Sequence, residues 1–231
     1  MNARQLQSIL SYRLGLAKWL FIHIPKNAGV SFAKAPALRW RMIRPAPWTY
    51  AEPGYAKALL QAMQAEGAHH GFAHARLRDV DPKISATLRP VAVIRNPWSR
   101  VVSRYRFAVM AYEQASNWQQ SAPPSFEAFL EERHRDGGKP FFWHRAVRGW
   151  YPQRDYIVDR QDKIAVDTLR LEHLDTEVPA YFGLTEPIRP RNVTRRAGGK
   201  TPWQELYTPK TIQIVADWYA EDIAEFGFDF D

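Results

Sequence analysis

The chain has 231 residues and a mass of 26.8 kDa; 45% of the residues are hydrophobic and 24% are charged. This composition is that of an ordinary globular protein, and it excludes intrinsic disorder, collagen-like repeats and a coiled coil as the main architecture. The lack of cysteine excludes disulfides, thiolate metal ligands and cysteine nucleophiles. The net charge of +8 favours an anionic ligand, such as nucleic acid, a phosphorylated cofactor, a sulfated or acidic glycan or an anionic membrane; a basic solvated surface is the alternative.

The length fits one ordinary domain, or at most two small ones, and we predict a single domain over residues 1–231, in which residues 1–18 form an N-terminal helix or arm. No apolar stretch approaches the roughly 18 residues that a membrane span needs. The basic N-terminus is followed neither by a long apolar segment nor by a cleavage site of small residues. We therefore expect a cytoplasmic protein without a signal peptide.

In the first half of the chain, apolar and partly β-branched segments predict two buried strands, at residues 19–24 and 89–94. Helical patterns predict one helix that begins within residues 32–40 and another over residues 54–66. The segments between them are expected to be a loop at 26–31 and a His-containing loop or short strand at 67–78.

In the second half, Asn96 and Pro97 are a strong helix start, because Asn is a good N-cap and Pro suits the first helical position. Two strands are expected at residues 155–158 and 164–171. The remaining predicted elements are a short helix over 125–133, an irregular basic loop over 187–202, and a last helix from Thr208 to Phe226. Strands that alternate with helices predict an α/β domain around a mostly parallel sheet.

The first segment suited to binding an anion is residues 21–31 (FIHIPKNAGVS), in which a strand leads through small residues into a helix. Such a loop presents backbone N–H groups and a helix N-terminus to an anion. Lys26 adds a positive charge and Ser31 adds a hydroxyl donor. The loop is not an ATP-type P-loop, in which lysine follows the glycine-rich segment. A plain turn between strand and helix is the alternative.

The second segment is residues 91–105 (VAVIRNPWSRVVSRY). Arg95 is placed at the end of a strand beside a helix N-terminus, and Ser103 lies about two turns into that helix. Together they could hold a phosphate from two sides, through hydrogen bonds of about 1.5–3 kcal/mol each. Alternatively, Arg95 pairs with a carboxylate and Ser103 is a surface hydroxyl.

Together, the segments HIPKNAGVS and RNPWSRVVSRY resemble the cytosolic and Golgi carbohydrate sulfotransferase superfamily, whose sulfuryl donor is 3′-phosphoadenosine 5′-phosphosulfate (PAPS). The segments QRDYIVD at 153–159, LEHL at 171–174 and YTP to FGF over 207–228 agree with it, so the resemblance covers roughly residues 19–228. It implies a P-loop NTPase-like α/β fold, in which helices flank a central parallel sheet.

The resemblance also implies residue roles. Lys26 would contact the 5′-phosphosulfate and stabilise the bridging oxygen as the S–O bond breaks, and Arg95 and Ser103 would bind the 3′-phosphate. Arg195 or Arg196 would reach a phosphate from a late loop. The product would be 3′-phosphoadenosine 5′-phosphate (PAP), and no metal is required. The backbone amides that would cradle the 5′-phosphate belong to Asn27, Ala28, Gly29, Val30 and Ser31.

Sulfuryl transfer needs a general base for the acceptor proton, and histidine suits this role because its ordinary pKa is about 6.5. Some glycan 2-O-sulfotransferases of the superfamily carry a catalytic histidine pair before the second strand, where this chain has GAHHGFAHAR. The resemblance therefore makes His74 the predicted base and His70 the second candidate, whereas His23 is interpreted as structural. A carboxylate base is the alternative, at Glu52, Glu66 or Asp79.

We expect the acceptor to be a sugar or glycan hydroxyl, and the aromatic and basic segment 140–154 is a candidate for its site. Two other functions stay open. A small-molecule kinase on the related fold would need a Walker-type lysine and a Mg²⁺-binding aspartate, and neither is found in the sequence. A non-enzymatic nucleic-acid or glycan-binding module would fit the charge. We expect neither nucleic acid nor a membrane as a partner.

Overall fold

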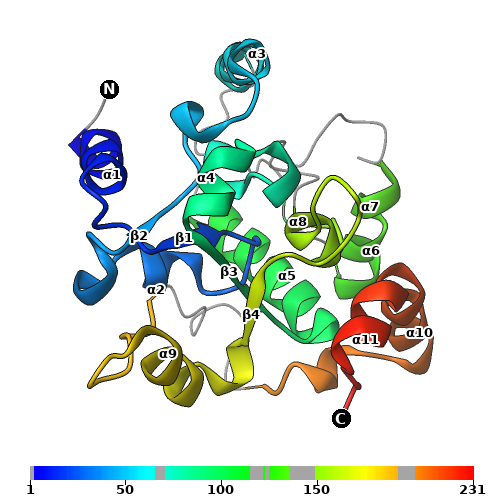
Figure 1. Cartoon of the computed structure of the whole chain (residues 1–231). Coiled ribbons are helices and arrows are strands. Elements are labelled where there is room, and N and C mark those ends of the chain that lie inside the picture. Colours follow the sequence, from blue (N-terminus) through cyan, green and yellow to red (C-terminus); the bar gives the residue numbers. More distant parts are fainter. Residues whose placement is uncertain (1–2, 66–70, 115–121, 123–124, 136–148, 192–200) are drawn as a thin grey trace. The chain divides into compact units, whose positions relative to one another are not determined.

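A computed structural model of the chain describes residues 3–65, 71–114, 122, 125–135, 149–191 and 201–231 (Figure 1). The chain divides into two compact units. The first unit is Met1–Ile94 with Pro140–Arg191, and the second is Arg95–Lys139 with Asn192–Asp231. The predicted strands all belong to the first unit.

A parallel sheet forms the centre of the first unit. Its strands are β1 (Trp19–Ile22), β2 (Met42–Ile43), β3 (Arg89–Ile94) and β4 (Asp167–Arg170), in the order β2-β1-β3-β4. All three pairings are parallel, which confirms the predicted α/β class. The β3 strand has the predicted bounds, and β1 is two residues shorter than expected at its end.

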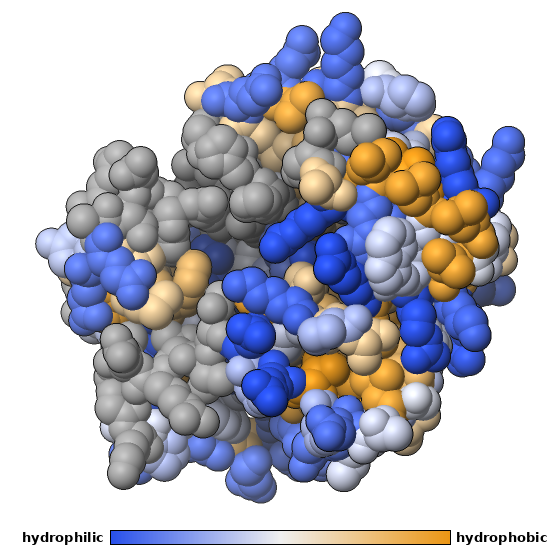
Figure 2. Space-filling model, turned by 90° about the vertical axis from the view of Figure 1, so that its left-hand side faces the viewer, coloured by the Kyte–Doolittle hydropathy of each residue, from blue (hydrophilic) through white to orange (hydrophobic). Residues whose placement is uncertain are grey.

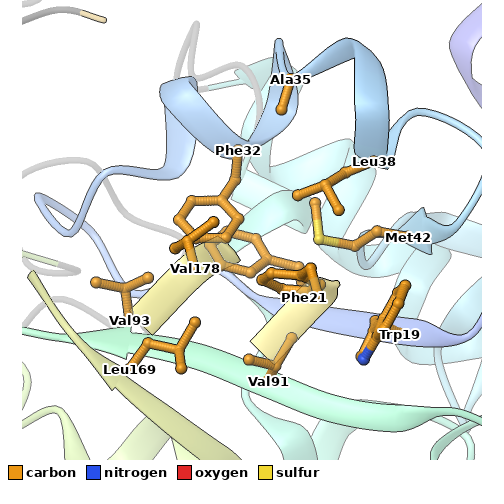
Figure 3. Packing of buried hydrophobic residues seen from close by; sticks show 11 residues of the cluster. Trp19, Phe21, Phe32, Ala35, Leu38, Met42, Val91, Val93, Leu169 and Val178 are labelled. Atoms are coloured by element: carbon orange, nitrogen blue, oxygen red, sulfur yellow. The ribbon is translucent and has the colours of Figure 1, made fainter. Parts of the chain in front are cut away.

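The core of the first unit lies on one face of this sheet, where α2 (Gly29–Ala33) and α9 (Leu174–Phe182) pack (Figure 3). Phe32 of α2 stacks on Phe21 of β1, with ring centroids 4.7 Å apart and planes 10° apart. Phe182 of α9 meets Phe32 edge to face. Each of these side chains contributes about 1.5–3 kcal/mol through burial, so they fix α2 firmly over the sheet.

The helix expected within residues 32–40 begins three residues earlier, at Gly29, and ends at Ala33. It cannot continue because Ala35 precedes Pro36, and a residue before proline is pushed out of the helical region. Ala35 is accordingly extended, with φ −74° and ψ 113°. A 3-10 turn, Pro36–Leu38, follows.

Segment 155–158 was predicted to be a strand, and this prediction is wrong. Its residues belong to the short helix α8 (Arg154–Ile157), and Val158 makes only an isolated antiparallel bridge to Ile164. A short apolar segment does not distinguish a strand from a buried helical turn, because it has no clear period; Tyr156, Ile157 and Val158 are consecutive buried residues. The strand expected at 164–171 is present in the shorter form β4.

The other helices of the first unit are α1 (Ala3–Arg13), α3 (Pro53–Ala65) and α4 (Pro82–Thr87). Helix α1 covers part of the segment 1–18 that was expected to be a helix or arm, and α3 matches the pattern expected for 54–66 within one residue at each end. Residues 71–79 contain two 3-10 turns, Gly71–His74 and Leu77–Asp79, and no strand.

Helix α1 exposes a row of leucines although it is anchored on the other side. Leu6 and Leu10 of this helix are 46% and 40% exposed, and Leu14, which follows the last helical residue, is 66% exposed. Gln7 donates to the carbonyl of Arg39 at 2.6 Å, and Ser11 donates to that of Trp40. Figure 2 shows the side of the molecule that carries α1, with hydrophobic residues in more than one patch among hydrophilic ones.

The second unit is helical in the residues described. It contains α5 (Pro97–Glu113), α6 (Phe126–Leu130), α7 (Glu132–Arg135), α10 (Pro209–Trp218) and α11 (Ala220–Phe226). The helix start at Asn96 is confirmed, since its side chain accepts a hydrogen bond from the N–H of Ser99 at 3.2 Å. Thr208 caps α10 in the same way, through the N–H of Thr211.

The last helix was expected to be continuous to Phe226, but it breaks at Tyr219. There the backbone has φ −120° and ψ 28°, outside the helical region. The Tyr219 ring is buried and lies 5.9 Å from the guanidinium carbon of Arg100 on α5. None of the helices described is long and apolar enough to cross a bilayer.

Candidate functional site

The loop between β1 and α2 presents unused backbone donors. Lys26 and Ala28 both have positive φ, 72° and 55°, which is uncommon for residues other than glycine. Within the described part of the chain, the N–H groups of Ala28, Gly29 and Val30 have no hydrogen-bond partner. Three neighbouring N–H groups without partners form the kind of concavity that binds an anion.

The other two predicted amides are already used within the loop. The N–H of Asn27 donates to the carbonyl of Ile24 at 3.3 Å, and that of Ser31 donates to the carbonyl of Ala28 at 2.8 Å. The predicted cradle of five amides is therefore reduced to the three central ones. Lys26, at the beginning of the loop, is half-buried.

The side chain of Asn27 anchors the loop. It is 1% exposed, and its Nδ2 donates to the carbonyl of Val93 and to Oε1 of Gln153, both at 2.7 Å. These bonds tie the loop to β3 and to the residue that precedes α8. Each is worth about 0.5–1.5 kcal/mol, so the backbone of the loop is held in place without a ligand.

Ser31 connects the loop to a later part of the chain. Its Oγ accepts a hydrogen bond from the N–H of Arg191 at 2.9 Å, which leaves its O–H available as a donor. Arg195 and Arg196, predicted to approach a phosphate, follow in a segment outside the described residues. His70 also lies outside them.

Gly29 is required by a close neighbour. A Cβ atom at this position would lie 1.8 Å from Nε2 of His23, far inside van der Waals contact. The imidazole of His23 therefore rests directly against the loop, in the space that a side chain would fill. His23 was interpreted as structural, and it does support the loop, but it also brings a ring nitrogen to the edge of the anion-binding backbone.

Arg44 determines the tautomer of His23. It follows β2, and its Nη2 lies 2.5 Å from Nδ1 of His23. Because a guanidinium group can only donate, Nδ1 must be the acceptor, and the neutral ring carries its proton on Nε2. Burial, and the charge of Arg4, lower the pKa of Arg44 to about 10. Its Nε is buried without a hydrogen-bond partner in the described structure.

His74 has the opposite tautomer. Its Nδ1 lies 2.8 Å from the backbone carbonyl of His23, so Nδ1 carries the proton and donates. The basic lone pair is then on Nε2. The rings of His74 and His23 are 4.1 Å apart, centroid to centroid, and His74 is only 8% exposed. The predicted base is thus held beside the residue that precedes the loop.

In the second unit, Arg95 and Ser103 are linked by a residue that we did not predict. Nε of Arg95 donates to Oγ of Ser99 at 2.5 Å. Ser99 and Ser103 are four residues apart on α5, so they share one helix face. Ser99 therefore holds the guanidinium group on the side of α5 that carries Ser103, which is half-buried.

The carboxylate candidates for the base lie elsewhere. Asp79 accepts two hydrogen bonds from Arg76, at 3.0 Å each. Glu52 lies near it at the edge of one pocket, and Glu66 is outside the described residues. In the part of the chain that is described, no group of three or more potential ligands could hold a metal ion.

A loop of open amides after the first strand of a parallel sheet is an arrangement suited to binding an anion in an α/β domain. The profile of the sulfotransferase domain matches residues 21–160, more than half of the chain. The chain therefore belongs to the sulfotransferase family, and it is a PAPS-dependent sulfotransferase. No curated protein and no solved structure shows significant similarity to it.

Three residues of this site, Ser99, His23 and Arg44, were either not predicted from the sequence or predicted without their role at the loop. Ser99 could have been found from its spacing of four with both Arg95 and Ser103. His23 precedes the loop directly, but the tautomer of its ring depends on Arg44. No sequence signal points to Arg44, because it reaches His23 only through the pairing of β1 with β2.

Proposed function

We propose that this enzyme transfers the sulfuryl group of PAPS to a hydroxyl group of a carbohydrate acceptor, with His74 as the general base. The observation that carries this proposal is the hydrogen bond from Nδ1 of His74 to the carbonyl of His23, at the beginning of the loop. A ring held through Nδ1 has one defined basic atom, Nε2, which suits the removal of a proton from the acceptor.

The loop fits the 5′ end of the donor. The open amides of Ala28, Gly29 and Val30 would hold the 5′-phosphosulfate, and Ser31 would add its O–H. As the acceptor oxygen bonds to sulfur and the S–O bond to the 5′-phosphate breaks, Lys26 would stabilise the charge on the departing oxygen. Nε2 of His74 would take the acceptor proton, and PAP would leave.

Arg95 and Ser103 are proposed to bind the 3′-phosphate, as the resemblance implies. The support is local: Ser99 holds the Arg95 guanidinium on the face of α5 that carries Ser103. For Arg195 and Arg196, the proposed contact with a phosphate rests only on the resemblance to the family. The cytoplasmic location likewise stays a prediction from the sequence, as does a single functional domain.

Calorimetric titration with PAP tests the donor site. We expect binding without a metal ion, weakened in both Lys26→Ala and Arg95→Ala, and no comparable binding of Mg²⁺-ATP. Lys83→Ala is a matched control, because Lys83 is exposed on α4 and has a similar charge. A preference for Mg²⁺-ATP would favour the kinase alternative, and no binding of either nucleotide would overturn the proposal.

Asp79 is the less suitable base. Its carboxylate accepts two bonds from Arg76, and its side chain is 11% exposed, so its lone pairs are largely occupied. The two candidates are separated by single-turnover measurements with PAPS and a panel of saccharide hydroxyls. Loss of transfer in His74→Ala, with transfer kept in Asp79→Asn, is expected; the reverse pattern would assign the proton transfer to the carboxylate.

A further inference from the structure

A pocket of about 230 Å³ is lined by residues that closely follow His74 in the sequence. None of its lining residues belongs to the proposed donor site. Three guanidinium groups and two carboxylates border it, so its lining has an excess of one positive charge. The residues that carry the argument are Glu52, Tyr55, Arg76, Arg78, Asp79 and Arg160.

Arg76 and Asp79 neutralise each other. Both Nε and Nη2 of Arg76 lie 3.0 Å from the carboxylate oxygens, and the backbone N–H of Arg76 adds a third contact to Asp79. This pair closes the turn Leu77–Asp79 and holds Arg78 at the pocket. Its charges therefore cancel, and the remaining electrostatic balance depends on Arg78, Arg160 and Glu52.

Arg78 and Arg160 are only weakly compensated. The carboxylate nearest to Arg78 belongs to Asp162, at 3.4 Å, and Arg154 already holds that carboxylate at 2.9 Å. The Nε of Arg78 is buried without a hydrogen-bond partner in the described structure. Arg160 donates to the carbonyl of Arg78 at 3.4 Å, and it makes no ion pair with any described residue.

A hydrogen bond to a charged group contributes about 1.5–3 kcal/mol, so an anionic ligand that accepts from these weakly compensated guanidinium groups gains affinity. Carboxylate and sulfate groups match the fork of a guanidinium group. The four residues from His74 to Arg78 span at most about 14 Å. A short oligosaccharide could therefore place one hydroxyl at His74 and an anionic group in this pocket.

We propose that this pocket binds a carboxylate or sulfate group of an anionic acceptor, through Arg78 and Arg160. This inference rests on the proposed function, because it names the class of acceptor that the same site would modify. Glu52 also borders the pocket, and its negative charge would disfavour the binding of a second anionic group there. The acceptor is accordingly expected to bear one such group near the hydroxyl that is sulfated.

The test measures binding to the PAP-saturated enzyme by fluorescence anisotropy. The probes are a labelled oligosaccharide of alternating glucuronate and N-acetylglucosamine, its carboxyl-reduced form, and the reduced form carrying sulfate esters. We expect at least one anionic probe to bind about tenfold more tightly than the neutral one. Tighter binding of the glucuronate form identifies a carboxylate ligand, and tighter binding of the sulfated form identifies a sulfate.

The double variant Arg78→Ala/Arg160→Ala should bind all three probes with affinities equal within about twofold. The control is Arg13→Ala/Lys83→Ala, which removes the same charge from exposed positions. It should keep the preference for the anionic probe. Equal binding by the wild type, or a preference that survives in the first double variant, would overturn the inference. PAP affinity separates the two hypotheses: if the wild type binds PAP but does not distinguish the probes, only the anionic pocket is wrong.

Discussion

Nδ1 of His74 donates a hydrogen bond of 2.8 Å to the backbone carbonyl of His23, and the two imidazole rings lie 4.1 Å apart. One residue thus orients the candidate base through its backbone and supports the anion-binding loop through its ring. Because Gly29 has no side chain, the ring can reach the loop. The backbone that is proposed to bind the donor and the candidate base are therefore coupled through His23.

His74→Ala should lower kcat by about 10²- to 10⁴-fold, the usual contribution of a general base. The Kd for PAP should change by less than about twofold, since the loop keeps its own anchors. Stopped-assay kinetics with PAPS and calorimetry with PAP give the two values. His173→Ala is the control, because His173 lies exposed at the start of α9. A His74→Ala enzyme with wild-type kcat would remove this residue from the mechanism.

Gly29→Ala should destabilise the fold by about 1–3 kcal/mol, because the added Cβ forces the His23 ring out of its position. PAP affinity should fall at the same time. Gly54→Ala is the matched control: Gly54 lies in α3 and has open space around its Cα. That variant should be neutral or slightly stabilising. Chemical denaturation of both variants measures the difference, and equal stabilities would contradict the contact.

His23 and His74 should have opposite neutral tautomers, with the proton on Nε2 of His23 and on Nδ1 of His74. Long-range ¹H–¹⁵N correlation spectra distinguish these forms directly. In Arg44→Met, His23 should lose its preference for the Nε2-protonated tautomer, because the donor to its Nδ1 is removed. His74 should keep its tautomer, since its partner is a backbone carbonyl, and it serves as the internal control. An unchanged His23 spectrum would show that Arg44 does not set its tautomer.

Ser99→Ala should weaken PAP binding by about three- to tenfold, because Arg95 loses the hydroxyl that positions its guanidinium group. Binding of adenosine 5′-monophosphate, which lacks the 3′-phosphate, should not change. Calorimetry with both nucleotides separates a specific effect from general damage. Ser85→Ala, at a half-buried serine on α4, is the control. An equal loss for both nucleotides would argue against a 3′-phosphate site at Arg95.

Asp162 should add a small, pH-dependent contribution to stability. A hydrogen bond from Arg154, and the charges of Arg154 and Arg78, hold the pKa of Asp162 below its ordinary 3.8. The folded state therefore favours the charged carboxylate, and the stabilisation is present above pH 3.8 and lost as the pH falls through the lower, folded-state pKa. The difference in unfolding free energy between the wild type and Asp162→Asn should therefore become smaller as the pH is lowered below 3.8, which denaturation measured at several acidic pH values would show. A constant difference would contradict the ion pair.

Local signals predicted much of the fold. The strand at 89–94 and the helix cap at Asn96 depend on neighbouring residues, and both are found where they were expected. The helix α8 was mistaken for a strand because a short apolar segment has no distinguishing period. The break at Tyr219 could not be read either, since it reflects the packing of that ring near Arg100.

The candidate site was predictable as a set of segments, but not as a set of contacts. The loop, Arg95, Ser103 and His74 follow from short motifs. The anchors of Asn27 lie 66 and 126 residues away in the chain, at Val93 and Gln153. Arg44 is equally remote from any motif, because only the parallel pairing of β1 and β2 brings it to His23. Such relationships depend on tertiary structure, which no local pattern contains.

The order β2-β1-β3-β4 also constrains how the protein can be made. Ile22 pairs with Ala92, and Ile94 pairs with Arg170, so the sheet is built from partners that are distant in sequence. A ribosome adds about 5–20 residues per second, so β1 and β2 emerge seconds before β3, and β4 comes later still. During this interval the buried strand β1 has no neighbour on one side. The nascent chain is then a natural client for chaperones, and fast translation shortens the time for which this edge is exposed.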